Sequence, residues 1–278
     1  MFQQYRLALV QMYSNMGLVE YNVAKAERYI RQAASNGAEL ILLPEAFSTG
    51  ADFNNGEENL RYAERIDGPT LTRMRTIAKE LSVYIVCPIV VNTGENCWEN
   101  TAFFIDNQGN ILGRYVKTHP VGCERDLVRR GTSYPVFDTK FGKIGISICY
   151  DICFPETSRL LALHGAEIVL VSAAWRGSHY FKEWWDINLQ CRAIDNLVYV
   201  AAVNACGCTG DGSEMFAGKS QVINPIGQVQ KMAGVEEETV LYQDIYPQRV
   251  AEERKSNPLL QDRYPEDYGD ILSSFTLP

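Results

Sequence analysis

Cys149 lies where a thiol can act as a nucleophile. It ends an apolar run, residues 144–148, and Pro155, a residue that favours the first helical position, follows shortly after it. A nucleophile at a sharp turn between a strand and a helix projects from the edge of its sheet, where backbone N–H groups can face a developing oxyanion. The G-x-S-x-G form of this turn is absent, so the position indicates a nucleophile without defining the reaction.

A thiol at neutral pH needs help from its neighbours, because the thiolate is the form that attacks. His119 is the only histidine near a predicted strand exit, so a cysteine–histidine pair stays an open alternative without further support. Two charged residues, Glu45 and Lys117, each come just after an apolar strand. A carboxylate can accept the thiol proton, and a nearby ammonium favours the thiolate. The alternative interpretation is that both are surface charges at strand ends.

Few residues in the chain could hold a metal. The chain has 3 histidines, and none of its 8 cysteines stands in the C-x-x-C spacing of a zinc site. Cys87 lies within an apolar strand and is expected to behave as a small hydrophobic residue. We therefore expect no metal, and we expect free thiols in a chain that begins without an export signal.

The composition is that of a globular protein, with 46% hydrophobic residues and a formal net charge of -8. The acidic balance leaves no obvious surface for a phosphate backbone, so a nucleic acid partner is not expected. The first residues lack the basic-then-apolar order of a signal peptide, and no apolar run reaches membrane-spanning length. We expect a cytoplasmic protein with no membrane partner.

Apolar periodicity predicts strands and helices that alternate along the chain. Strand–helix–strand units indicate crossover connections in a buried sheet, and no linker or repeat divides the chain. We predict a single α/β domain over residues 1–278, layered as helix, sheet, sheet, helix, with a C-terminal arm from about residue 257 that packs on the body or on a partner. The predicted strands are residues 5–12, 39–43, 83–90, 101–106, 111–116, 134–138, 143–149, 168–172, 197–203, 218–222 and 228–232; the predicted helices are 20–34, 70–80, 182–195 and one that begins at 155.

Several segments are similar to those of the nitrilase, or carbon–nitrogen hydrolase, superfamily. The glutamate, lysine and cysteine segments occur in the order and at the separations of that superfamily, and the resemblance covers nearly the whole chain. The matching stretches are residues 8–11, 42–47, 100–102, 113–119, 145–156, 192–196, 218–220 and 224–227.

This resemblance implies a Glu–Lys–Cys triad that works without a metal or an organic cofactor. Glu45 would take the proton of Cys149 and later activate water, and Cys149 would form a thioester with the acyl group. Lys117, with the backbone N–H of Tyr150, would hold the tetrahedral oxyanion. The resemblance also implies an αββα sandwich that forms homodimers or larger assemblies.

A second glutamate often follows the lysine in this superfamily, seven residues ahead of a glycine. Glu124 stands seven residues ahead of Gly131 and matches this pattern. It would orient Lys117 or the leaving amine, and the alternative is a solvated loop charge.

The residues after the nucleophile resemble those of the amidase and carbamoylase branches. True nitrilases tend to have Cys-Trp-Glu, whereas this chain has Cys149-Tyr150-Asp151 and then Phe-Pro-Glu at residues 154–156. The first expectation is therefore hydrolysis of a small amide, which releases ammonia or an amine and a carboxylic acid.

One position departs from relatives that act on amides of dicarboxylic acids. They often have an arginine just before Phe-Pro-Glu, where this chain has Cys153, which cannot bind a carboxylate. Arg176 is the best candidate for that task, and Trp175 for an apolar pocket wall. The alternatives are an exposed loop arginine and a core or interface tryptophan.

Two other functions stay open. The chain could hydrolyse an N-carbamoyl compound and release carbon dioxide as well as ammonia. It could also be a catalytically silent relative that acts as a binding or scaffold protein, although a complete Glu–Lys–Cys set favours an enzyme.

Overall fold

Strand β1 (Tyr5–Gln11) shows how the sequence builds the layers of the computed structural model, which describes residues 3–51, 56–94, 97–177 and 182–273. Leu7 and Leu9 point into a core between two sheets, whereas Ala8 and Val10 point into a second core under a pair of helices. Successive side chains of a strand face opposite sides, so a strand that is apolar on both sides must be covered on both faces.

The first sheet holds seven described strands in the order β13-β1-β2-β4-β5-β6, with β3 paired to β4 at its end. β1, β2 and β4 run parallel, and the β4–β5 and β5–β6 pairs are antiparallel. Its further strands are β2 (Leu40–Leu42), β3 (Glu64–Arg65), β4 (Tyr84–Gly94), β5 (Cys97–Ile105), β6 (Ile111–Val116) and β13 (Thr239–Ile245).

The second sheet holds six described strands in the order β12-β11-β10-β9-β8-β7, with β8, β9 and β10 parallel. Its face packs on the first sheet, where Ile146 and Ile148 share the inner core with Leu7 and Leu9. The strands are β7 (Val136–Thr139), β8 (Gly142–Ile148), β9 (Ile168–Ala173), β10 (Tyr199–Asn204), β11 (Gln221–Ile223) and β12 (Val229–Met232).

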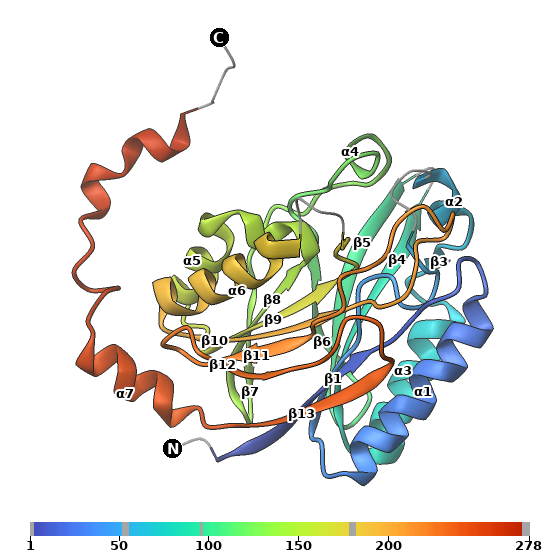
Figure 1. Ribbon diagram of the computed structural model, residues 1–278, viewed down its shortest axis with the longest axis horizontal. Helices are drawn as coiled ribbons and strands as arrows, with labels where there is room; N and C mark the ends of the chain where they lie inside the picture. Colours follow the sequence, from blue (N-terminus) through green and yellow to red (C-terminus); the bar gives the residue numbers. More distant parts are fainter. Residues whose placement is uncertain (1–2, 52–55, 95–96, 178–181, 274–278) are drawn as a thin grey trace.

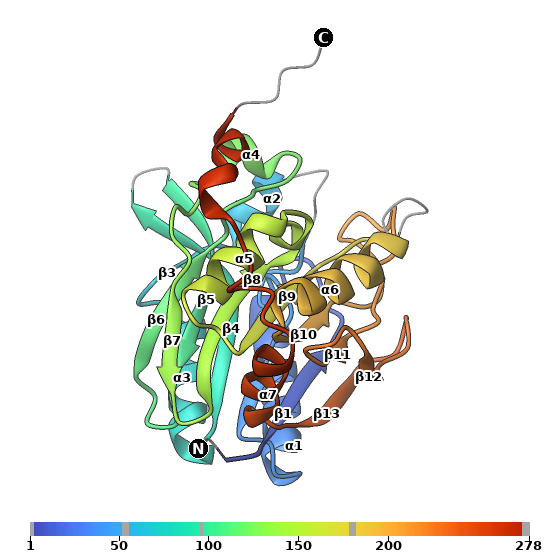
Figure 2. The same cartoon turned by 90° about the vertical axis from the view of Figure 1, so that its left-hand side faces the viewer.

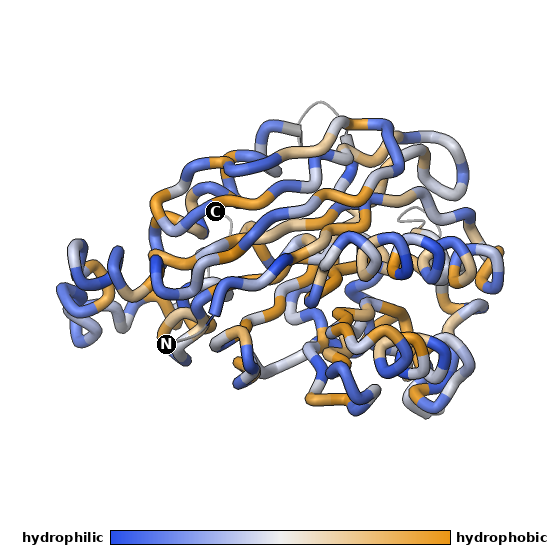
Figure 3. The backbone as a smooth tube through the Cα atoms, turned by 90° about the horizontal axis from the view of Figure 1, so that it is seen from below, coloured by the Kyte–Doolittle hydropathy of each residue, from blue (hydrophilic) through white to orange (hydrophobic). Residues whose placement is uncertain are grey.

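Two pairs of helices cover the outer faces of the sheets (Figure 1). α1 (Val19–Ser35) and α3 (Pro69–Leu81) bury their apolar stripes on the first sheet, and α5 (Pro155–Leu163) and α6 (Lys182–Asn196) bury theirs on the second. Figure 3 shows the sheets between helical layers, with apolar segments concentrated in the strands. The predicted αββα sandwich is therefore confirmed.

The predicted elements are present, and several more that lacked a clear pattern are added. β13 is an edge strand in which only two side chains are buried, and α7 (Gln248–Ser256) buries only Val250, so neither carries a strong apolar period. The segment after Cys149, predicted as a loop, is a 3₁₀ turn, η1 (Cys149–Cys153). Two further short helices are α2 (Gly56–Arg61) and α4 (Glu124–Leu127).

The C-terminal segment after α7 runs along the outside of the molecule (Figures 1 and 2). Leu260 contacts the core, whereas Tyr264, Ile271 and Leu272 are 65%, 61% and 91% exposed. The segment contains two 3₁₀ turns, η2 (Pro265–Asp267) and η3 (Gly269–Leu272). Its apolar side chains are thus largely uncovered in the single chain.

Candidate active site

Three of the predicted site residues each follow a strand. Glu45 follows β2, Lys117 follows β6, and Cys149 follows β8. β2 and β4 are parallel, and two antiparallel steps from β4 through β5 bring β6 back to that direction. The carboxyl ends of β2 and β6 therefore lie at one edge of the first sheet, and carboxyl ends of strands are where α/β sheets bind ligands.

Lys117 is the centre of the charged cluster. Its Nζ lies 2.8 Å from Glu45 Oε1 and 2.6 Å from Glu124 Oε2, and its side chain is fully buried. Burial acts to lower the pKa of Lys117, but Glu124, Glu45 and Cys149 together hold it well above its ordinary value. The lysine is therefore an ammonium at neutral pH, and the predicted contact with Glu124 is present.

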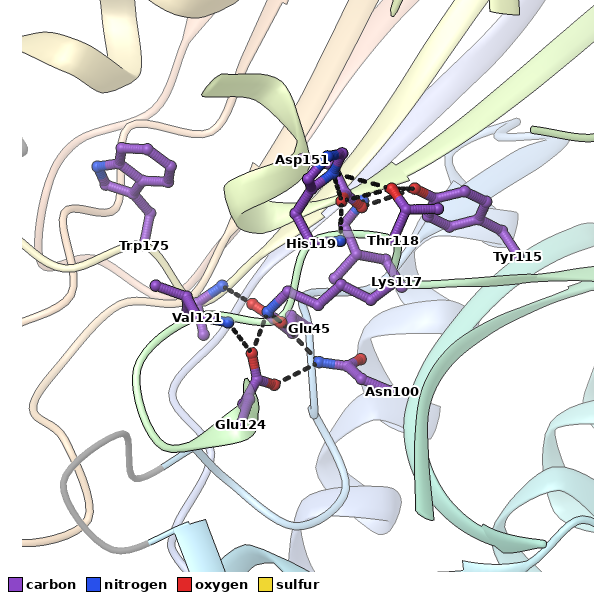
Figure 4. A network of polar contacts seen from close by, with 12 residues as sticks. Glu45, Asn100, Tyr115, Lys117, Thr118, His119, Val121, Glu124, Asp151 and Trp175 are labelled. Atoms are coloured by element: carbon purple, nitrogen blue, oxygen red, sulfur yellow. Dashed lines mark hydrogen bonds and ion pairs between the residues drawn. The ribbon is translucent and has the colours of Figure 1, made fainter. Parts of the chain in front are cut away.

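Backbone and amide groups complete the surroundings of the two carboxylates (Figure 4). Ala174 N–H donates to Glu45 Oε2 at 2.9 Å, and Val121 N–H donates to Glu124 Oε2 at 3.1 Å. Asn100 Nδ2 donates to Glu45 Oε1 and to Glu124 Oε1. We did not predict a role for Asn100, although it begins one of the matching stretches, because a neutral amide within a strand carries no chemical signature.

Cys149 is 5% exposed and opens η1 with a φ of 49°. This left-handed backbone is unusual for a residue with a side chain and is frequent at functional sites. Burial and the charge of Glu45 raise the pKa of Cys149 well above its ordinary value, and Lys117 lowers it. We expected the ammonium to favour the thiolate, but burial and Glu45 outweigh it, so the resting group is a thiol.

Asp151 connects the turn that carries Cys149 to the segment after Lys117. It is fully buried and accepts hydrogen bonds from Tyr115 Oη at 2.7 Å, Thr118 Oγ1 at 2.9 Å and the Ile148 N–H at 3.1 Å. His119 approaches the same carboxylate, with Nδ1 2.9 Å from Asp151 Oδ1. The histidine that could have served Cys149 therefore contacts Asp151 instead.

A pocket of about 250 Å³ opens over Cys149. Trp175 is 4% exposed and its ring lies 5.6 Å from that of Trp185, so it both lines the pocket and packs in the core. Arg176 Nη1 lies 3.4 Å from Glu214 Oε1 at a half-buried place. The described residues that line the pocket are Val121, Gly122, Cys149, Tyr150, Ala174, Trp175 and Arg176.

Comparisons with known proteins agree with this geometry. The sequence profile of the carbon–nitrogen hydrolase family matches residues 6–255. This chain belongs to the carbon–nitrogen hydrolase family. It is therefore a hydrolase that acts on carbon–nitrogen bonds other than peptide bonds, and its amidase-like relatives support the predicted superfamily.

Individual relatives of this carbon–nitrogen hydrolase are amidases. A deaminated glutathione amidase of Synechocystis sp. is 35% identical over 275 residues, which cover 93% of this chain and 98% of that protein. An omega-amidase of Homo sapiens is 30% identical over 277 residues, which cover 95% and 96%. The crystal structure of an amidase from Nesterenkonia sp. superposes with a TM-score of 0.82 at 28% identity and covers 96% of each chain.

Two features are absent from the part of the chain that the structure describes. No group of three or more His, Cys, Asp or Glu side chains in that part of the chain is arranged to hold a metal ion. No helix within it is long and apolar enough to cross a membrane.

Proposed function

We propose that this enzyme hydrolyses a small amide through a thioester on Cys149. The observation that carries this proposal is that Cys149 lines a pocket and is acted on by the Glu45 carboxylate and the Lys117 ammonium, which lie 2.8 Å apart. Burying an ammonium and two carboxylates costs several kcal/mol per ion before their attraction is counted. Such a cluster is best explained by chemistry that needs it.

In the first half of the reaction, the Cys149 sulfur attacks the amide carbon while its proton passes to Glu45. A raised thiol pKa fits this order, because the proton leaves as the bond forms and no free thiolate is needed beforehand. The tetrahedral intermediate then expels ammonia or an amine, which takes the proton from Glu45. The products of this half are the thioester and the free amine.

In the second half, Glu45 takes a proton from water as the water oxygen attacks the thioester carbon. The carbon–sulfur bond breaks, the carboxylic acid leaves, and the proton returns to the sulfur. In both halves Lys117 and the Tyr150 N–H stabilise the oxyanion, and losing one such donor costs about 100-fold or more in other hydrolases. Glu124 pairs with Lys117 alongside Glu45 and helps to hold it in place.

The pocket limits the substrate class. A volume of about 250 Å³ is smaller than the usual range for drug-sized ligands, so a compact amide fits best. Trp175 would contact the apolar part of the substrate. We propose that Arg176 binds a substrate carboxylate, for which it exchanges its partly exposed contact with Glu214, a pair worth only about 0–1 kcal/mol.

A substrate screen tests the proposed reaction. The purified enzyme and Cys149→Ser are each incubated with primary amides, monoamides of dicarboxylic acids, N-carbamoyl compounds and nitriles, with ammonia and carbon dioxide both measured. We expect ammonia without carbon dioxide from the amides, and none from the variant. Carbon dioxide from the carbamoyl compounds would favour the carbamoylase, and no turnover by the enzyme on any class would favour a scaffold.

We also propose that the chain works as a homodimer or larger assembly in the cytoplasm. Trp184, Ile187 and Ile194 on α6 are 50%, 56% and 46% exposed, and Leu163 at the end of α5 is 45% exposed. Large apolar side chains gathered on one helical layer are typical of a protein interface. The arm from about residue 257 would add its own exposed apolar residues to that contact.

A further inference from the structure

Asn100 has a place in the site that the reaction steps above do not use. It lies on β5, is 2% exposed, and directs its amide at the two carboxylates that flank Lys117 (Figure 4). Nδ2 lies 2.8 Å from Glu45 Oε1 and 3.0 Å from Glu124 Oε1. One NH₂ group thus donates both of its hydrogens, one to each carboxylate.

The orientation of this amide follows from its surroundings. A carbonyl oxygen in the place of Nδ2 would face two carboxylate oxygens and be repelled by both, so the nitrogen belongs there. As a result Asn100 Oδ1 is buried and has no hydrogen-bond partner among the described residues. An unpaired buried acceptor costs stability, so the two donated bonds are the reason for an asparagine at this position.

Glu99, the residue before Asn100 on β5, has different partners. Glu99 points to the other side of β5, where it pairs with Arg114 and Arg129. Arg129 N–H also donates to the Trp98 backbone oxygen at 2.8 Å. The loop that carries Glu124 is therefore fastened to β5 on one side, while Asn100 meets Glu124 itself on the other.

We propose that Asn100 is a positioning residue that holds Glu45 and Glu124 on Lys117 and keeps Glu45 aimed at Cys149; this inference rests on the proposed function. The groups that face Glu45 from the packed elements are Lys117 after β6, Glu124 of α4 and Cys149 of η1. Two carboxylates share one ammonium there, so a neutral donor to both offsets their repulsion without neutralising Lys117.

The test compares how the reactivity of Cys149 depends on pH. Alkylation by iodoacetamide, followed by intact mass, reports loss of the proton from Cys149, because the thiolate is the form that reacts. Asn100→Leu keeps the volume and removes both donors, so the negative charge of Glu45 is less offset and disfavours the Cys149 thiolate more strongly. The midpoint of alkylation should therefore move to higher pH by on the order of one unit.

Asn100→Asp gives a second variant of the same shape. It replaces the donor by a further carboxylate beside Glu45, and this added negative charge disfavours the Cys149 thiolate. The midpoint of alkylation should therefore also rise. The matched control is Asn196→Leu. Asn196 is 1% exposed, donates one hydrogen bond to the Arg192 backbone oxygen and likewise has an unpaired Oδ1, but lies on α6. It should keep the wild-type midpoint.

The outcomes separate this inference from the proposed function. A wild-type midpoint in folded Asn100→Leu overturns the inference, and if that variant does not fold, a wild-type midpoint in Asn100→Asp does so. A rise in Asn196→Leu equal to that in Asn100→Leu also overturns it, because the effect would then belong to any buried amide. Hydrolysis retained in Cys149→Ser would instead refute the proposed function.

Discussion

Two opposing influences act on Cys149. Burial and the Glu45 carboxylate hold its pKa well above the ordinary value, while the Lys117 ammonium lowers it. The balance keeps the proton on sulfur at neutral pH and makes Glu45 necessary for its removal. Glu45 therefore has two measurable effects, one on turnover and one on the pKa of Cys149.

Glu45→Gln should separate these effects. Turnover should fall by about 10²- to 10⁴-fold, the usual contribution of a general base. The pKa of Cys149 should fall at the same time, because the Glu45 charge that raises it is removed while Lys117 remains. The ultraviolet absorbance of the thiolate, read against a Cys149→Ser background, follows this titration.

The predicted fall in turnover and the predicted fall in the pKa of Cys149 can each be refuted separately. Substantial residual turnover would show that another group is the base, and an unchanged thiol titration would show that Glu45 does not control Cys149.

Arg176 offers a prediction about specificity. Arg176→Leu should raise KM for monoamides of dicarboxylic acids by about tenfold or more, because a hydrogen bond to a charged group contributes about 1.5–3 kcal/mol. KM for uncharged amides of the same length should change little. Steady-state kinetics on matched amide pairs measure the difference, and an equal change for both kinds would exclude carboxylate recognition by Arg176.

The sequence revealed the charged residues of the site better than the neutral ones. Glu45, Lys117 and Cys149 each follow an apolar strand, and the resemblance to the superfamily indicated Glu124 by its spacing to Gly131. Asn100 has no such mark, since its role exists only when two carboxylates from distant segments face it. Residues that act through their neighbours appear only once the chain is folded.

At the scale of elements, parallel strands bring the site residues together. The loop after β6 depends on one close approach: Gly131 N–H donates to the Lys117 backbone oxygen at 2.8 Å, and a Cβ on Gly131 would lie 2.1 Å from the Val116 oxygen. A glycine is therefore required seven residues after Glu124 for steric reasons.

Gly131→Ala tests this contact. The added methyl group must push the end of β6 away, which should displace Lys117, reduce turnover and destabilise the fold by about 1–3 kcal/mol, the usual cost of overpacking. Gly269→Ala is the control, because a Cβ there meets no atom within 4 Å. Denaturant unfolding together with turnover measures both effects, and a Gly131→Ala enzyme as active and stable as the control would contradict the packing argument.

Strands and helices were predicted correctly where burial of one face imposes a regular spacing of apolar residues, and they were missed where it does not. β1, β8 and α3 bury regular faces and were predicted to within two residues. β13 lies at a sheet edge and is held by its hydrogen bonds to β1. α7 buries only Val250, so neither element has a continuous apolar face.

At the scale of the whole molecule, the two helical layers differ in what they leave exposed. The α5–α6 layer presents Trp184, Ile187 and Ile194 to solvent. Ile187→Glu should weaken the proposed assembly, because a charge would have to be buried in an apolar contact. Leu18→Glu, at a position that is 57% exposed beside α1 on the opposite layer, is the matched control.

Size-exclusion chromatography with light scattering measures this prediction. The wild type and Leu18→Glu should give a multiple of the 31.3 kDa chain mass, and Ile187→Glu should shift toward the single chain. A wild-type enzyme that stays at 31.3 kDa at micromolar concentration, or an Ile187→Glu variant with unchanged mass, would refute the interface.

The central claim is that the thiol, carboxylate and ammonium act together on one acyl group. Rapid acid quenching during turnover of an amide substrate, followed by intact mass and peptide mapping, tests it most directly. We predict an added acyl mass on the peptide that contains Cys149, lost on treatment with hydroxylamine and absent in Cys149→Ser. Turnover with no adduct on Cys149 under any quench time, or an adduct on another cysteine, would contradict the account.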